Sequence, residues 1–108
     1  MTYIVDIDGT ICTPAIDGKY LESLPYYNRI KKINDLYDNG NTIIYCTARG
    51  MGRNKNNADN AIEEFFEMTE KQLASWGVKY HKLFLGKPAG DIYIDDKGTN
   101  AEEFFKGI

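Results

Sequence analysis

The sequence contains one histidine, two cysteines and no long apolar run among its 108 residues, and each shortage excludes a class of protein. His81 has no second histidine with which to build a catalytic or metal site, so we expect an ordinary surface or turn residue. Cys12 and Cys46 lack the spacing of a zinc site and fall beside or inside predicted strands, which favours reduced thiols over a disulfide. No stretch approaches the roughly 20 apolar residues of a membrane span.

Positive charge is also in short supply. Acidic residues outnumber basic ones by 16 to 13, the net charge is -3 and the pI is about 5.1. This balance argues against nucleic acid or an anionic membrane as the main partner. The first residues lack the basic start and apolar core of a signal peptide, so we expect a cytoplasmic protein. The length allows one modest hydrophobic core and predicts a single domain over residues 1–108.

Short runs of β-favouring residues alternate with segments of helical periodicity. The runs predict four strands, at residues 3–7, 42–47, 82–85 and 91–95. Apolar side chains at three- and four-residue spacing predict helices at residues 25–39, 58–76 and 100–108. Residues 9–24, interrupted by proline and glycine, predict an irregular excursion. Strands joined by helices imply a parallel sheet with right-handed crossovers, and we expect an α/β fold built as a three-layer α/β/α sandwich.

Polar residues follow the predicted strands at the point where each strand ends. They are Asp6, Asp8, Thr47, Lys87, Asp95 and Asp96. The carboxyl ends of parallel strands meet at one edge of the sheet, where ligands of such folds collect. The sequence therefore predicts that four acids, one hydroxyl and one lysine converge there.

The acids at this edge predict a metal site. Asp6 and Asp8 lie two residues apart on a strand, so their side chains point to the same face. With Asp95 and Asp96 alongside, these carboxylates repel one another unless a cation lies among them. Oxygen ligands without histidine or thiolate fit Mg²⁺. Taken alone, an Asp-x-Asp pair is as consistent with turn capping or solvation, and it also occurs as the metal–nucleotide clamp of glycosyltransferases, where a nucleotide-binding region precedes it.

The motifs "DIDGT", "YCTARG", "GKP" and "YIDDK", in this order, resemble those of the haloacid dehalogenase (HAD) superfamily of phosphatases. The resemblance covers nearly the whole chain. It implies that Asp6 is the nucleophile, that Asp8 is the general acid and base, and that Lys87 supplies countercharge. It also implies that Thr47 donates to a phosphate oxygen and that Asp95 and Asp96 hold Mg²⁺. A further ligand is implied at the backbone carbonyl of Asp8.

The resemblance implies a magnesium-dependent phosphomonoester phosphatase that works through an aspartyl-phosphate. Its implied substrate-binding residues are Gly9, Thr10, Ala48 and Arg49. The stretches 9–24 and 48–86 are too short for the cap domain that many members insert, so we expect a capless, HAD-like domain. Similarity to small bacterial phosphatases of capsule or surface-polysaccharide biosynthesis, in "DGKYLESLP" and "WGVKYHKLFLGKP", implies a sugar phosphate or a related small metabolite.

Other interpretations stay open. A phosphomutase uses the same two aspartates but needs a cap to exclude water, and a nucleotide or polynucleotide phosphatase shares the motifs. A phosphate-binding or receiver-like module also groups acids, a threonine and a lysine, although in a different order along the chain. Arg53 and Lys55 could recruit an anionic leaving group or could be a solvated loop. The aromatic residues Tyr26, Tyr27, Phe104 and Phe105 could mark a homodimer surface or could complete a small core.

Overall fold

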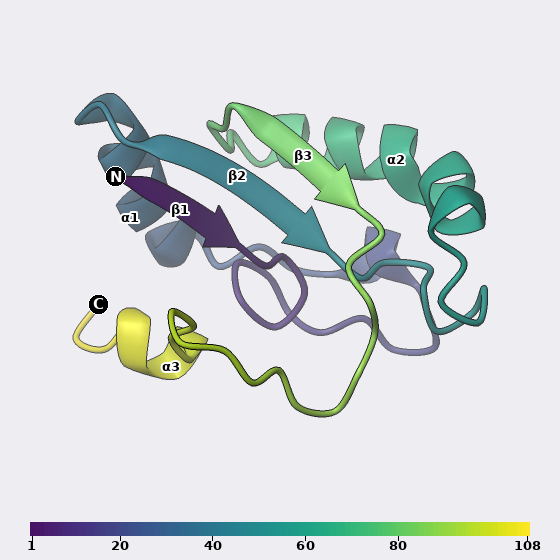
Figure 1. The fold of residues 1–108 in the computed structure, drawn as a ribbon. Helices are drawn as coiled ribbons and strands as arrows, with labels where there is room; N and C mark the ends of the chain where they lie inside the picture. Colours follow the sequence, from purple (N-terminus) through teal and green to yellow (C-terminus); the bar gives the residue numbers. More distant parts are fainter.

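The computed structural model describes all 108 residues as a parallel sheet with helices packed against it (Figure 1). The sheet has three strands in the order β1-β2-β3, and both neighbouring pairs are parallel. The strands are β1 (Thr2–Val5), β2 (Thr42–Thr47) and β3 (Lys82–Leu85). Three of the four predicted strands and the α/β class are therefore confirmed.

The helices begin and end where local chemistry dictates. They are α1 (Tyr27–Asp38), α2 (Ala58–Ser75) and the short α3 (Ala101–Phe104), with one 3-10 turn, η1 (Tyr20–Glu22), in the excursion. The side chain of Asn57 accepts a hydrogen bond from the amide of Asn60 and caps the start of α2. Gly77, with φ of +73°, follows the end of α2 in the left-handed conformation that glycine adopts without strain.

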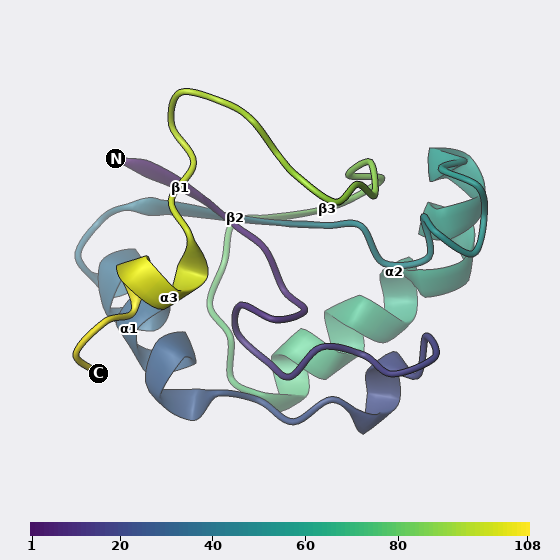
Figure 2. The same cartoon turned by 90° about the horizontal axis from the view of Figure 1, so that it is seen from below.

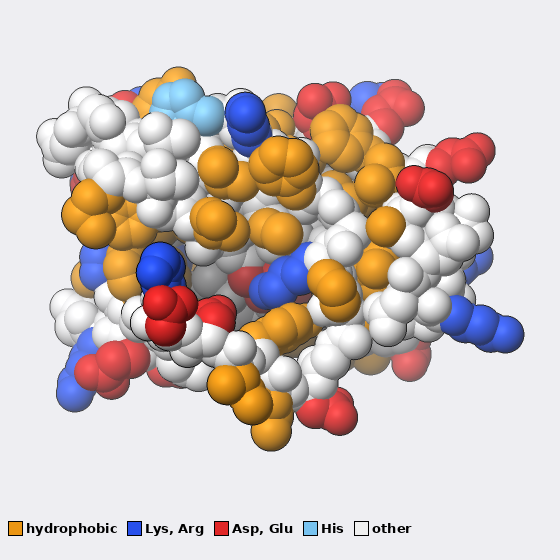
Figure 3. Space-filling view, in the orientation of Figure 1, with side chains coloured by type: hydrophobic (Ala, Val, Ile, Leu, Met, Phe, Trp, Pro, Cys, Tyr) orange, Lys and Arg blue, Asp and Glu red, His pale blue; other side chains and the backbone are white.

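All three helices lie on one face of the sheet (Figure 2). The core between the two layers is closed by branched and aromatic side chains that are fully buried, among them Ile7, Ile11, Ile43, Tyr45 and Leu73. The opposite face carries no helix, and hydrophobic side chains gather on it (Figure 3). Ile4 is 70% exposed there and Phe84 is 50% exposed. The chain thus forms two layers, and the second helical layer of the expected sandwich is not among its elements.

The predicted strand at residues 91–95 is wrong. Every residue from 88 to 100 is exposed, and the segment (yellow-green in Figure 2) arches away from the sheet on the side opposite the helices. Ile92 is 78% exposed and Ile94 is 92% exposed. A strand needs hydrogen bonds from a neighbour as well as β-favouring side chains. The backbone of this segment makes none to β1, whose outer edge stays unpaired.

Other expectations are met more simply. Both cysteines are free, and burial raises the pKa of Cys12 to about 12, which keeps that thiol protonated. Phe105 is 4% exposed and completes the core, whereas Tyr27 is 62% exposed. Tyr26 and Phe104 are half-buried, so Tyr27 is the one exposed member of this aromatic group. None of the helices combines the length and the apolar character needed to cross a membrane.

Candidate active site

The two motif-one aspartates are held in a tight turn that follows β1. Ile7 lies between them and is fully buried, so it anchors the backbone while the acids on either side stay partly exposed. The amides of Thr10 and Ile11 both donate to the carbonyl of Ile7, at 3.0 and 2.9 Å. Gly9 adopts a φ of +78°, which an L side chain would resist. The sequence D-I-D-G-T therefore builds a rigid turn that presents both carboxylates at the sheet edge.

Asp6 is the less compensated of the two acids. Its side chain is 36% exposed, Lys87 Nζ lies 3.8 Å from its Oδ1, and the Thr10 hydroxyl donates to its Oδ2 at 3.3 Å. Burial raises the pKa of Asp6 above its ordinary value of 3.8, and this effect outweighs the lowering by Lys87, by the amide of Ile7 and by Thr10. Such a carboxylate, accessible and poorly solvated, is suited to attack an electrophile or to bind a cation.

Asp8 is held in a different way, by a buried arginine. Arg49 Nε donates to Asp8 Oδ2 and Arg49 Nη2 donates to Asp8 Oδ1, both at 3.0 Å. The Asp8 side chain keeps 21% exposure while that of Arg49 has none. The two parallel hydrogen bonds fix the plane of the carboxylate as well as its position.

The remaining contacts of Arg49 explain why it is buried. Its Nη1 donates to Gln72 Oε1 at 2.7 Å and to Thr69 Oγ1 at 3.3 Å, both on α2. The ring of Tyr20 lies 4.8 Å from the guanidinium carbon. The expectation that Arg49 contacts substrate is therefore corrected: its side chain has no exposed surface and is fully engaged by the protein.

Thr47 and Lys87 reach the same edge from the ends of β2 and β3. Thr47 is 1% exposed, and its Oγ1 accepts from the amide of Arg49 at 3.1 Å. The amide of Lys87 donates to the carbonyl of Thr47 at 3.3 Å. Lys87 Nζ also lies 4.4 Å from the centre of the Tyr93 ring. The structure thus brings Asp6, Asp8, Thr47 and Lys87 together as predicted from the strand ends.

The backbone amides near the acids divide into two groups. The amides of Gly9 and Thr10, expected to bind substrate, donate instead to the carbonyls of Cys12 and Ile7. Those of Asp8 and Ala48 donate to no protein group, and both residues are partly exposed. The amides at positions 8 and 48 are therefore the ones left without a protein acceptor.

Asp95 and Asp96 do not join this group. Asp95 accepts from the amides of Lys97 and Gly98, which hold its pKa below the ordinary value, and Asp96 pairs with Lys97 Nζ at 3.0 Å. No set of three or more acidic, cysteine or histidine side chains gathers as a metal site. The expected convergence of four acids fails because the strand that would carry the second pair does not form. Lys87 pairs with Asp6 and Arg49 with Asp8, so each acid of the first pair has a cationic side chain beside it.

Oxygen donors for Mg²⁺ are nevertheless present at the sheet edge. The Asp6 carboxylate is partly exposed, and the carbonyl of Asp8 accepts no hydrogen bond from the protein. These two donors fit a hard cation that keeps several of its waters. The ligand set is incomplete without a further acid.

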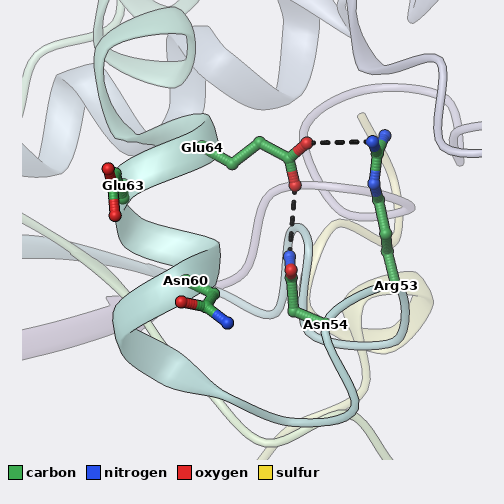
Figure 4. Close-up of a pocket in the computed structure, with 5 residues that line it drawn as sticks. All are labelled: Arg53, Asn54, Asn60, Glu63 and Glu64. Carbon is green, nitrogen blue, oxygen red and sulfur yellow. Dashed lines mark hydrogen bonds and ion pairs between the residues drawn. The ribbon is translucent and has the colours of Figure 1, made fainter.

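A surface hollow lies elsewhere, between the loop after β2 and the first turns of α2 (Figure 4). It is lined by Arg53, Asn54, Asn60, Glu63 and Glu64. Glu64 accepts from Asn54 at 3.1 Å and pairs with Arg53 at 3.2 Å, so these side chains satisfy one another. Of the five, only Arg53 was a candidate in the sequence, for recruiting an anionic leaving group, and here it is an exposed member of a surface ion pair.

The sequence gives one overlooked signal for the role of Arg49. Thr69 and Gln72 are polar residues on the buried face of an amphipathic helix, three positions apart. Buried polar side chains need partners, so this pair predicts a polar group reaching α2 from elsewhere in the chain. That group is Arg49.

Comparison with known proteins supports the fold. No protein-family profile and no curated protein matches the chain. The crystal structure of a structural-genomics target from Vibrio cholerae superposes with a TM-score of 0.88 and 27% sequence identity. The alignment covers 97% of this chain and 87% of that one. The two chains share one fold.

Proposed function

We propose that this protein is a magnesium-dependent phosphomonoester phosphatase, a capless member of the HAD superfamily that forms an aspartyl-phosphate on Asp6. One observation carries the proposal. Asp6 is a partly exposed, desolvated carboxylate 3.8 Å from Lys87, next to a second carboxylate that Arg49 holds in a fixed orientation. The four-motif resemblance supports the same assignment, and a sugar phosphate or related small metabolite is the proposed substrate.

The reaction proceeds in two steps on the two aspartates. An Asp6 carboxylate oxygen attacks phosphorus, the bond from phosphorus to the ester oxygen breaks, and protonated Asp8 gives its proton to the departing alcohol. A water molecule then attacks the phosphorus of the aspartyl-phosphate while Asp8 takes its proton. The acyl oxygen of Asp6 leaves as carboxylate, and inorganic phosphate is released.

Positive charge and donors at the edge stabilise the transferring phosphoryl group. Lys87 supplies a cation beside Asp6, and the free amides of Asp8 and Ala48 supply neutral donors. Mg²⁺, when bound, adds charge neutralisation for the phosphoryl oxygens. Asp6 and the carbonyl of Asp8 would be its ligands at the edge.

A phosphate-release screen tests the proposal. Sugar phosphates, nucleotides and phosphorylated amino acids are offered with Mg²⁺ and with chelator, to the unchanged protein and to Asp6→Asn. Release that requires both Mg²⁺ and Asp6 is expected, with Asp35→Asn as the matched control because Asp35 only pairs with Lys31 on the exposed surface of α1. Release by Asp6→Asn at the unchanged rate would rule out covalent catalysis on Asp6, and metal-independent release would rule out the Mg²⁺ assignment.

The accessibility of Asp6 favours hydrolysis over phosphoryl transfer to a second substrate. A phosphomutase must keep water from its phospho-enzyme, whereas the Asp6 side chain is 36% exposed and no cap covers it. Isomerisation of a sugar phosphate without release of phosphate in the same screen would reverse this preference.

A further inference from the structure

We propose that Arg49 is the positioning residue for Asp8: it holds the Asp8 carboxylate at the orientation from which proton transfer to the leaving group occurs. The inference rests on the proposed phosphatase function and assigns to Arg49 a role behind the reacting groups instead of contact with substrate.

The first support is the geometry of the pair. Both Asp8 oxygens are bound, one by Nε and one by Nη2 of the same guanidinium, each at 3.0 Å. A planar fork of this kind restricts rotation of the carboxylate about its last bond, which a lysine ammonium cannot do. Each Asp8 oxygen has a second lone pair, so the acid carries its proton on the side away from Arg49. Since proton transfer depends on the direction of the donor oxygen, this restriction bears directly on the first step.

The second support is the way in which Arg49 is itself held. Its third nitrogen is bound by Gln72 and Thr69 of the 18-residue helix α2, and the Tyr20 ring lies against it at 4.8 Å. Tyr20 is tied to the same cluster because its hydroxyl accepts from the amide of Gly50, at 3.0 Å. The long helix α2, acting through Arg49, therefore helps to fix the orientation of Asp8, in addition to the turn on which Asp8 lies.

The third support is the asymmetry of burial across the pair. The guanidinium is fully buried, while Asp8 keeps 21% of its side chain exposed. An ion pair that served folding alone gains little over a well-packed apolar pair, because both charges lose their water. Here the cation lies behind the anion, and the anion faces the site.

The test compares two leaving groups in the first turnover. An alkyl or sugar phosphate needs a proton on its leaving oxygen, whereas p-nitrophenyl phosphate leaves as a stable phenolate. Rapid-quench measurement of leaving-group release in Arg49→Lys and Arg49→Met isolates the step in which Asp8 is the acid. We expect release from the alkyl phosphate to fall about 100-fold and release of p-nitrophenol to fall less than about 10-fold, since a positioned general acid contributes roughly 10²–10⁴-fold.

Lys71→Met is the matched control, because Lys71 is an exposed cation on the same helix that pairs only with Glu67, and both of its rates should be unchanged. If the Arg49 variants fail to fold, Thr69→Val is used instead, because it removes one acceptor of Arg49 Nη1 at nearly constant side-chain volume. Release from the alkyl phosphate should again fall more than release of p-nitrophenol, but both losses should be smaller. Equal losses for both leaving groups in a folded variant would overturn the positioning role and leave the phosphatase proposal intact. Absence of phosphate release from the unchanged protein with every substrate would overturn both.

Discussion

Two segments leave the same edge of the sheet and differ in burial. The β2 loop, residues 48–57, turns inward at once: Arg49 is 1% exposed and Met51 is 2% exposed. The β3 tail, residues 86–100, is exposed from residue 88 to its end. Both carry charged residues assigned to the site by motif resemblance, but only the β2 loop places its charge against Asp8. In the β3 tail only Lys87, two residues after the end of β3, lies against an acid of the site, 3.8 Å from Asp6. A motif residue therefore reaches the site where its segment is still held by the sheet or anchored in the core.

The largest effect should come from removing that anchor. Arg49→Ala leaves Asp8, Gln72 and Thr69 without their shared partner, and we expect the free energy of unfolding to fall by about 3 kcal/mol. This is the low end for a broken buried pair, because Asp8 keeps access to water. Urea denaturation measures the loss.

Lys97→Ala is the corresponding change in the β3 tail, where Lys97 pairs with Asp96 and both side chains are more than four-fifths exposed. It should alter the free energy of unfolding by less than about 0.5 kcal/mol. Comparable losses in the two variants would remove the contrast between the segments.

A second, smaller loss of stability should come from adding a methyl group in the β2 loop. Gly50 has a φ of +77°, and a Cβ at this position would overlap the ring of Phe65. Gly50→Ala should cost about 2 kcal/mol, from left-handed backbone strain together with overpacking. Gly90→Ala in the β3 tail is the control, because nothing lies within 4 Å of its Cβ position and its φ is not positive. Equal melting temperatures for the two variants would show that the loop is less tightly packed than described.

A third effect depends on pH and has opposite signs at Asp6, in the turn after β1, and at Asp95, in the β3 tail. The folded-state pKa of Asp6 is raised, so the folded protein holds more protons than the unfolded chain, and stability falls as pH rises from below 3.8 through that pKa. Asp6→Asn should therefore be more stable than the unchanged protein at neutral pH and equally stable in acid.

Asp95 is the carboxylate of the β3 tail that titrates the other way. Its folded-state pKa is lowered, so its contribution to stability is present above pH 3.8 and is lost as pH falls. Asp95→Asn should be slightly less stable than the unchanged protein at neutral pH. Melting temperatures measured from pH 3 to 8 give the pH dependence of each variant relative to the unchanged protein. If both variants were more stable than the unchanged protein at neutral pH, or both less stable, the opposite directions of the two pKa shifts would be contradicted.

The contrast also explains which features could be predicted from the sequence. Strands 42–47 and 82–85, both main helices and the grouping of Asp6 with Lys87 follow from periodicity and from the geometry of parallel strands. The burial of Arg49 depends on Thr69 and Gln72, which lie 20 and 23 residues further along, so local patterns do not reveal it. The strand expected at residues 91–95 does not form. An apolar run shows that a segment favours the β conformation, but it does not show whether a neighbouring strand will pair with that segment.

The smallest expected effect tests that failure directly. Ile94 is 92% exposed in the β3 tail, so Ile94→Asp should change the free energy of unfolding by less than about 0.5 kcal/mol. If the segment instead paired with the open edge of β1 and buried this side chain, the same charge would cost several kcal/mol, because an ionised carboxylate in an apolar site lacks water and a partner. Ile43→Asp, at a fully buried position of β2, shows the size of that penalty in this protein. A loss for Ile94→Asp close to that of Ile43→Asp would place the tail in the sheet. Asp95 and Asp96 would then follow a paired strand at the edge that carries Asp6.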